Sequence, residues 1–110
     1  MQKESLTALV QEHLENAATA SSGRSAHTIY GGHERSLRQT LIALRAGSNL
    51  DEHENPGEAT LHVLHGHVSL VAGKSRCDGT PGDLMTIPDA RHALEAIEDS
   101  AVLLTVAMRK

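Results

Sequence analysis

The sequence predicts an all-β barrel or sandwich that carries one amphipathic α-helix at its N-terminal end. After residue 24, short stretches rich in Val, Ile, Leu and Thr alternate with Gly, Pro and acidic residues, at spacings of about eight to twelve residues. Before that point, apolar residues recur every three or four positions, which is the period of a helix. The length of 110 residues is that of a single ordinary domain. We therefore expect one domain with one core.

Residues 1–23 form the predicted helical segment. Ser5 is a suitable N-cap, and the small residues of 20–23, which end in a glycine, are suited to terminate the helix. The polar side of the helix is expected to carry His13. Such a helix is too short to be stable alone, so it should pack on the barrel or on a partner subunit. Its apolar stripe consists of Leu6, Leu9, Val10, Leu14, Ala17 and Ala18.

Residues 24–110 form the predicted barrel, in which we expect seven strands. Two of these strands carry apolar residues on both faces, at 41–44 and 102–104. One face of each should therefore be covered by the helix or by a second subunit, and we expect a homodimer. The expected strands are 26–30, 36–44, 59–64, 67–71, 84–87, 92–97 and 102–108.

The composition excludes several classes of function. The chain has ten Lys and Arg against fourteen Asp and Glu, no Phe or Trp, and one Tyr, so it lacks the basic face and the aromatic platforms of nucleic-acid-binding proteins. A single cysteine, Cys77, forms no disulfide within the chain and has no neighbour that would activate it. No apolar run is long enough for a membrane span or a leader. We expect a cytoplasmic protein with no membrane partner.

Two glycine-framed segments carry histidines at characteristic spacings. In the first, Gly47 is followed by five residues, then His53, and the segment closes at Gly66. This frame resembles the first cupin motif, in which Asn55 stands at the position of the second histidine and Ala59 at that of the glutamate. Glu58 is offset by one residue and should point to the opposite face unless a bulge re-aims it.

The second segment is GDLMTIPDARH. A glycine, Gly82, is followed by five residues, Pro88 and then His92, which resembles the second cupin motif with His92 as its histidine ligand. The interval between Pro88 and His92 is one residue shorter than usual, and Ala90 replaces the customary glycine. The short interval between the two motifs is typical of compact microbial cupins. The resemblance implies a cupin double-stranded β-helix, or jelly-roll barrel.

A cupin metal site uses three imidazoles and one carboxylate, of which His53 and His92 are present here. We expect a barrel without a complete metal site, in which these two histidines hydrogen-bond in a polar pocket. The alternative is a metal-dependent enzyme, an oxygenase or isomerase using Fe, Mn, Ni or Zn. Its third ligand would come from Asn55, a re-aimed Glu58, or Gln39.

The predicted function is the binding of a small, largely apolar molecule inside the barrel. One polar group could enter the pocket from Arg38 or Gln39, or both side chains could face solvent. A third possibility is an auxiliary interaction protein whose helix and strand faces build a dimer. His33, His62, His65 and His67 are expected at the surface. The expected pocket residues are Gln39, Asn55, Ala59, Leu61, Val63 and Met85.

Overall fold

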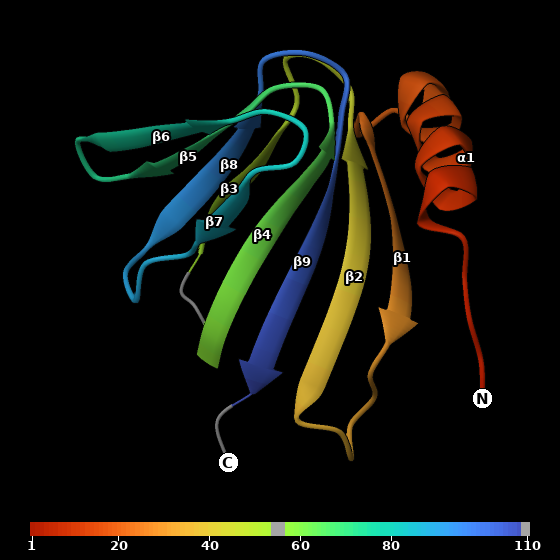
Figure 1. Cartoon of the computed structure of the whole chain (residues 1–110). Coiled ribbons are helices and arrows are strands. Elements are labelled where there is room, and N and C mark those ends of the chain that lie inside the picture. Colours follow the sequence, from red (N-terminus) through yellow and green to blue (C-terminus); the bar gives the residue numbers. More distant parts are fainter. Residues whose placement is uncertain (54–56, 109–110) are drawn as a thin grey trace.

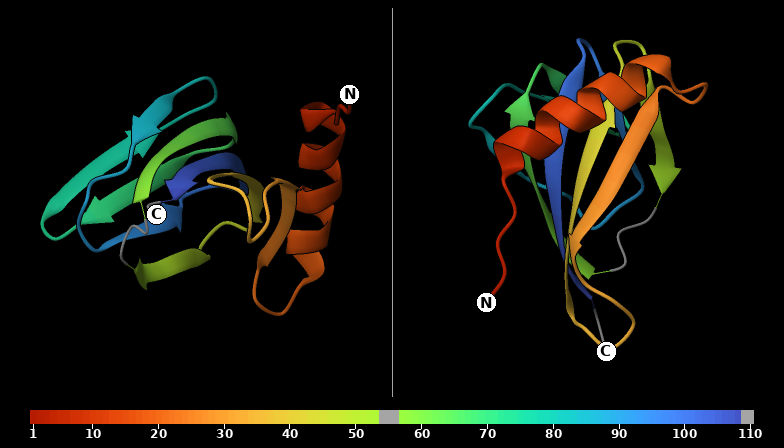
Figure 2. Two further views of the ribbon diagram at one scale, coloured as in Figure 1. Left: turned by 90° about the horizontal axis from the view of Figure 1, so that it is seen from below. Right: turned by 90° about the vertical axis from the view of Figure 1, so that its right-hand side faces the viewer.

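The computed structural model describes residues 1–53 and 57–108, and within them it contains one helix and nine strands. The strands form two antiparallel sheets that face each other (Figure 1). The helix lies against the five-stranded sheet, on the side away from the four-stranded sheet (Figure 2). The predicted all-β fold with one N-terminal helix is confirmed. No helix in the described part of the chain is long and apolar enough to cross a bilayer.

The five-stranded sheet has the order β1-β2-β9-β4-β7. Pairing between β2 and β9 is regular from Leu37 to Leu44, and β9 also pairs along nearly the whole length of β4. The central strand is thus β9, one of the two strands whose sequences are apolar on both faces. The bounds are β1 Arg24–Tyr30, β2 Leu37–Leu44, β4 Gly57–His65, β7 Leu84–Thr86 and β9 Ser100–Met108.

The four-stranded sheet has the order β3-β8-β5-β6. Its two edge strands, β3 Asn49–His53 and β6 Ser75–Gly79, were not predicted, because their sequences NLDEH and SRCDG lack an apolar alternation. Both are held by backbone pairing to the more apolar inner strands, which suffices for an edge strand. The inner strands are β5 Val68–Ala72 and β8 His92–Ala96.

The core fills the space between the sheets. It is formed almost entirely by aliphatic side chains that project inward from alternate positions of both sheets. Such close packing supplies most of the stability of a domain of this size. The buried cluster comprises Ile42, Leu44, Leu61, Val63, Val68, Leu70, Met85, Leu94, Ala96 and Val102.

The helix α1, Leu6–Thr19, covers the outer face of β1 and β2. Its N-cap is Ser5, whose side chain accepts a hydrogen bond from the Ala8 amide, as expected. The helix ends at Ala20 in an extended conformation, while the left-handed glycine, Gly23, lies in the following turn. Arg45 secures this end, because its guanidinium donates to carbonyl oxygens of the last turn.

The expectation that His13 lies on the polar side of the helix is wrong. His13 is 8% exposed and lies with Ala17 on the face that contacts the sheet. The reason is geometric, since position 13 is three residues after Val10 and four before Ala17, both of which belong to the apolar stripe. Its Nδ1 lies 2.7 Å from the hydroxyl of Ser25 on β1, which gives one of the two buried ring nitrogens a hydrogen-bond partner.

Candidate functional site

The two motif histidines lie on neighbouring strands at one end of the barrel. Strand β3 ends at His53, strand β8 begins at His92, and the backbone register pairs these two residues directly. The pairing is irregular between Leu50 and His53, which marks a local distortion of β3. Asn55 lies outside the described residues. The topology therefore brings the two expected ligand positions together across the four-stranded sheet.

His92 is buried, with 4% of its surface exposed, and contributes to the wall of the barrel interior. Its Nδ1 lies 2.8 Å from the carbonyl oxygen of Ala90. A carbonyl only accepts, so Nδ1 carries the proton, and in the neutral ring the lone pair is on Nε2. Metal-binding histidines are commonly oriented by such a bond, and so are histidines that hydrogen-bond to a ligand.

The acidic residue of the first motif faces away from the interior. In β4 the alternation places Ala59 on the same face as the buried Leu61 and Val63, and the pairing with β9 is regular from Gly57 to Val63. No bulge re-aims Glu58, which is exposed on the opposite face. The position that the resemblance assigns to a metal-binding glutamate is thus occupied by a methyl group.

The described side chains do not form a complete cupin metal site. No group of three or more His, Cys, Asp and Glu in the described part of the chain is placed to hold a metal ion. His92 supplies one nitrogen donor, while Ala59 supplies none and Glu58 is on the wrong face. The donor set therefore does not match the three imidazoles and one carboxylate of the motif.

Strand β2 directs two polar residues, Arg38 and Thr40, to the concave face of its sheet. Residues 38, 40, 42 and 44 share that face, because Ile42 and Leu44 belong to the core and the strand is regular. Gln39 lies on the outer face, where its Nε2 donates to the hydroxyl of Thr105 at 3.3 Å. The register also pairs Gln39 with Tyr30 on β1.

The barrel interior itself is filled. The expected pocket residues Leu61, Val63 and Met85 are all part of the buried core cluster. The remaining cavity has a volume of about 30 Å³, enough for a water molecule or two, whereas pockets for small molecules measure hundreds of Å³. Its wall consists of Ile42, Leu50, Leu61, Leu70, Ile87, His92, Leu94 and Leu104. A metabolite therefore has no room at the centre of the barrel.

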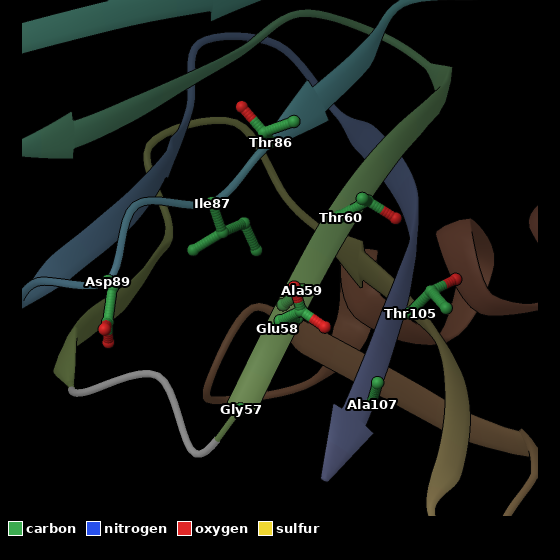
Figure 3. A pocket seen from close by; sticks show the side chains of 9 residues that line it. All are labelled: Gly57, Glu58, Ala59, Thr60, Thr86, Ile87, Asp89, Thr105 and Ala107. Carbon is green, nitrogen blue, oxygen red and sulfur yellow. The ribbon is translucent and has the colours of Figure 1, made fainter. Parts of the chain in front are cut away.

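A larger pocket opens where β7 ends, at the edge of β4 (Figure 3). Its volume is about 490 Å³. Because β7 extends only to Thr86, the first residues of β4 form a sheet edge there, and side chains of both faces reach the pocket. We call this space the edge pocket. It is lined by Gly57, Glu58, Ala59, Thr60, Thr86, Ile87, Asp89, Thr105 and Ala107.

Three threonines form a row across the edge pocket. Thr60 on β4 pairs with Thr105 on β9 and with Thr86 on β7, so the three lie side by side on the outer face. Threonine hydroxyls both donate and accept hydrogen bonds, and their methyl groups add apolar surface. Two carboxylates, Glu58 and Asp89, also line the pocket. The pocket thus offers polar groups of several kinds beside apolar side chains.

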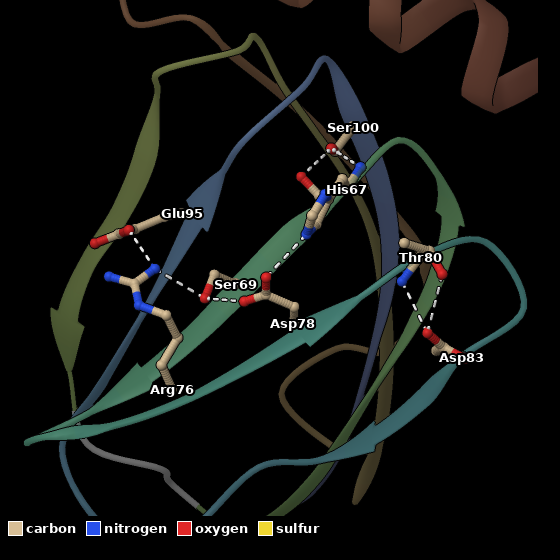
Figure 4. Close-up of polar contacts among 8 residues, drawn as sticks. All are labelled: His67, Ser69, Arg76, Asp78, Thr80, Asp83, Glu95 and Ser100. Atoms are coloured by element: carbon tan, nitrogen blue, oxygen red, sulfur yellow. Dashed lines mark hydrogen bonds and ion pairs between the residues drawn. The ribbon is translucent and has the colours of Figure 1, made fainter.

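A second polar cluster lies away from this pocket, on the outer face of the four-stranded sheet (Figure 4). The Asp78 carboxylate accepts from Ser69 Oγ at 2.7 Å and contacts His67 Nε2 at 3.1 Å, and Arg76 bridges Ser69 and Glu95. The hydrogen bond from Ser69, followed by that from His67, lowers the pKa of Asp78. The Asp78 carboxylate lies between the hydroxyl and the imidazole, so the imidazole does not contact Ser69, and the cluster lacks the order of a Ser-His-Asp triad.

Two features of the site were not predicted from the sequence. The threonine row is visible in the sequence only once the strand pairing is known, since Thr60, Thr86 and Thr105 are far apart in the chain. Whether Arg38 or Gln39 faces the barrel interior depends on which set of alternate residues of β2, the even or the odd, points inward. Residues 41–44 are apolar at both the even and the odd positions, so the hydrophobic period alone does not show which set faces inward.

No family model and no curated protein matches the sequence. Solved structures do match. A conserved protein of unknown function from Streptococcus pyogenes superimposes with a TM-score of 0.74 at 23% identity, covering 83% of this chain and 79% of that one. A cupin superfamily protein from Desulfitobacterium hafniense gives 0.72 at 16% identity, with 78% of each chain covered.

An enzyme shares the same fold over part of its length. Salicylate 1,2-dioxygenase from Pseudoaminobacter salicylatoxidans, a mutant in complex with gentisate, gives a TM-score of 0.75 at 16% identity; the match covers 91% of this chain and 32% of that chain. These likenesses show the fold. The chain has the cupin fold, as the resemblance of its two motifs predicted.

Proposed function

We propose that this cupin barrel binds a small molecule at its open end, without a complete metal site. We define the open end as the region around Ala59 where β4 begins and β7 ends. The observation that carries the proposal is the edge pocket of about 490 Å³, which has Ala59 in its wall at the position of the motif's glutamate. A methyl group there leaves room for a ligand where a carboxylate would hold a metal ion.

The packing of the barrel supports this location. The interior is filled by aliphatic side chains down to a cavity of about 30 Å³, so the ligand must be held at the open end rather than at the centre. The row of Thr60, Thr86 and Thr105 and the apolar Ile87 provide both hydrogen bonds and apolar contacts there. Small-molecule pockets combine these two kinds of surface.

The alternative function is a metal-dependent oxygenase or isomerase of the cupin type. The observation that favours it is the register of His53 with His92, together with the bond from His92 Nδ1 to Ala90. Such an enzyme would need a third ligand, for which Asn55 is a candidate by sequence. The similarity of the fold to a dioxygenase fits this alternative, since the match covers 91% of this chain.

Two measurements on the untagged protein decide between the functions. The first is metal content by mass spectrometry for the wild type and the His53→Ala, His92→Ala double variant. Near-stoichiometric metal that is lost in the double variant would overturn the proposal in favour of the metal enzyme. We expect no stoichiometric metal in either protein.

The second measurement is a thermal-shift screen of a metabolite library. A ligand of the edge pocket should raise the Tm of the wild type and lose this effect in Ala59→Leu, which fills the pocket wall. The matched control is Ala72→Leu, in the last residue pair of the β5–β6 hairpin and not among the residues that line the pocket, and this variant should keep the shift. A library in which no compound stabilises the wild type would contradict ligand binding.

A further inference from the structure

Arg38 is a cation on the concave face of the five-stranded sheet, close to the open end. It pairs in register with Val106 on β9, and Val106 pairs with Ala59 on β4. These three residues therefore form one cross-strand row on the face that carries the core. Ala59 also lines the edge pocket, so the row leads from the pocket to the arginine.

The neighbours of Arg38 in this row are small or short. Strands in a sheet are about 4.8 Å apart, so Ala59 lies about 10 Å from Arg38 across the intervening Val106. The long side chain of an arginine can extend over a valine, and the methyl group of Ala59 leaves the space beyond it open. A small ligand could thus lie over Val106 with Arg38 at one end and the edge pocket at the other.

Polarity falls with depth below this row. The next row inward is Thr40, Leu104 and Leu61, and the one after it is Ile42, Val102 and Val63, which is wholly aliphatic. A ligand at the open end would therefore meet a charged group at the level of Arg38, then one hydroxyl, that of Thr40, and only aliphatic side chains in the row beneath. This gradient suits a molecule with one charged end and an apolar body.

Arg38 has no protein partner among the described residues. Its Nε is buried and makes no hydrogen bond there. Four other arginines do have partners: Arg24 donates to Asn49, Arg35 to Tyr30, Arg45 to the end of the helix, and Arg76 to Ser69 and Glu95. Since a guanidinium stays protonated and a buried donor without an acceptor is costly, an acceptor from a ligand would stabilise this side chain.

We propose that Arg38 anchors the ligand of the open end through a carboxylate, so that the barrel binds small monocarboxylic acids with an apolar body. This inference rests on the proposed function and names its ligand class. A carboxylate fits because it matches the planar fork of arginine with two parallel hydrogen bonds. A dianion is disfavoured, because Glu58 and Asp89 line the same pocket and the chain has a net charge of −4.

The test compares acids with their neutral isosteres on the full chain. Benzoate and hexanoate, each paired with its primary amide, are titrated into ¹⁵N-labelled protein, and the side-chain Nε–H resonance of Arg38 is followed by NMR. We expect the acids to shift this resonance saturably and to bind at least tenfold more tightly than the amides. Equal affinities of acids and amides would overturn the carboxylate proposal while leaving ligand binding in place.

Two variants of Arg38 distinguish the effect of the paired hydrogen bonds of the guanidinium from the effect of its positive charge. Arg38→Gln should abolish the preference for acids over amides. Arg38→Lys keeps the positive charge and should weaken acid binding several-fold. The lysine variant also provides the test if the glutamine variant does not fold. Arg24→Gln, an exposed arginine of β1, is the matched control and should bind as the wild type does. Acid binding that survives in both Arg38 variants would overturn the proposal, as would a wild type that binds neither acids nor amides. The metabolite screen tests the proposed function independently in the latter case.

Discussion

The imidazole of His13 stacks on that of His27 across the boundary between helix and sheet, with ring centroids 5.7 Å apart and planes inclined by 28°. His13 also contacts the hydroxyl of Ser25, and Nε2 of His27 lies 3.4 Å from the Glu4 carboxylate just before the helix. The helix is thus attached to β1 by polar contacts as well as by its apolar stripe. This makes the segment 1–23 an integral part of the barrel's outer layer.

Replacing His13 by alanine should lower the free energy of unfolding by about 2 kcal/mol, because it removes a buried ring and the hydrogen-bond partner of Ser25. The measurement is urea unfolding followed by circular dichroism. His33→Ala, in an exposed loop, is the control and should change stability by less than about 0.5 kcal/mol. Equal effects of the two substitutions would mean that the helix docks without the help of His13.

The Asp78 cluster should make stability depend on pH in the acid range. Hydrogen bonds from Ser69 and His67 lower the pKa of Asp78 in the folded state relative to the unfolded chain. Its contribution is therefore present above the unfolded value of about 4 and is lost as the pH falls through the lower folded value. The stability gap between the wild type and Asp78→Asn should accordingly close below about pH 4 in urea unfolding series.

Ser69→Ala tests the cause of that dependence, since Ser69 gives the largest share of the effect on Asp78. Its acid-range slope should lie between those of the wild type and Asp78→Asn. An unchanged slope in Asp78→Asn would show that other carboxylates dominate acid unfolding.

Gly66, the closing glycine of the first motif, should not tolerate alanine. Its φ is +85°, and a Cβ there would overlap the carbonyl oxygen of Asp99 and the side chain of Ser100. We expect Gly66→Ala to lower the free energy of unfolding by about 2–4 kcal/mol, from strain plus the displaced β9 turn. Gly73→Ala is a matched control, because its φ is +60° with open space around it. It should cost only about 1 kcal/mol, as measured by thermal unfolding; a similar loss in both would rule out the overlap as the cause.

The parts of the fold that could be predicted from the sequence are those with an alternation of apolar residues or a characteristic spacing of glycines. The strands that build the core show this alternation, whereas β3 and β6 do not, since edge strands need only backbone partners. The position of His13 was misjudged from its polarity, although its spacing from Val10 and Ala17 placed it on the buried face. Spacing was the better guide because it follows from helix geometry.

The site was less accessible to sequence reasoning, because its residues meet only through strand pairing. The motif predicts Ala59 in the wall of a pocket inside the barrel, whereas the pocket that Ala59 lines in the structure is the edge pocket. Leu61 and Val63 share its face but lie deeper, where the two sheets close on each other. Whether an inward-facing residue of β4 is buried in the core or open to the pocket depends on how far the opposing sheet extends over it. The local sequence pattern does not contain that information.

Restoring the motif's carboxylate tests the register of β4 and the metal alternative together. Because Ala59 faces inward with Leu61, Ala59→Glu should place a carboxylate near the two motif histidines and raise the affinity for Mn²⁺ or Zn²⁺ at least tenfold in calorimetric titrations. Adding His92→Ala should remove the gain, whereas adding Glu58→Gln, on the outer face, should not. Since Arg38 shares the row of Ala59 and can pair with the new carboxylate, the same titration is made with Arg38→Gln as well. Metal affinity that stays unchanged in both backgrounds would show that His53 and His92 do not converge on this position.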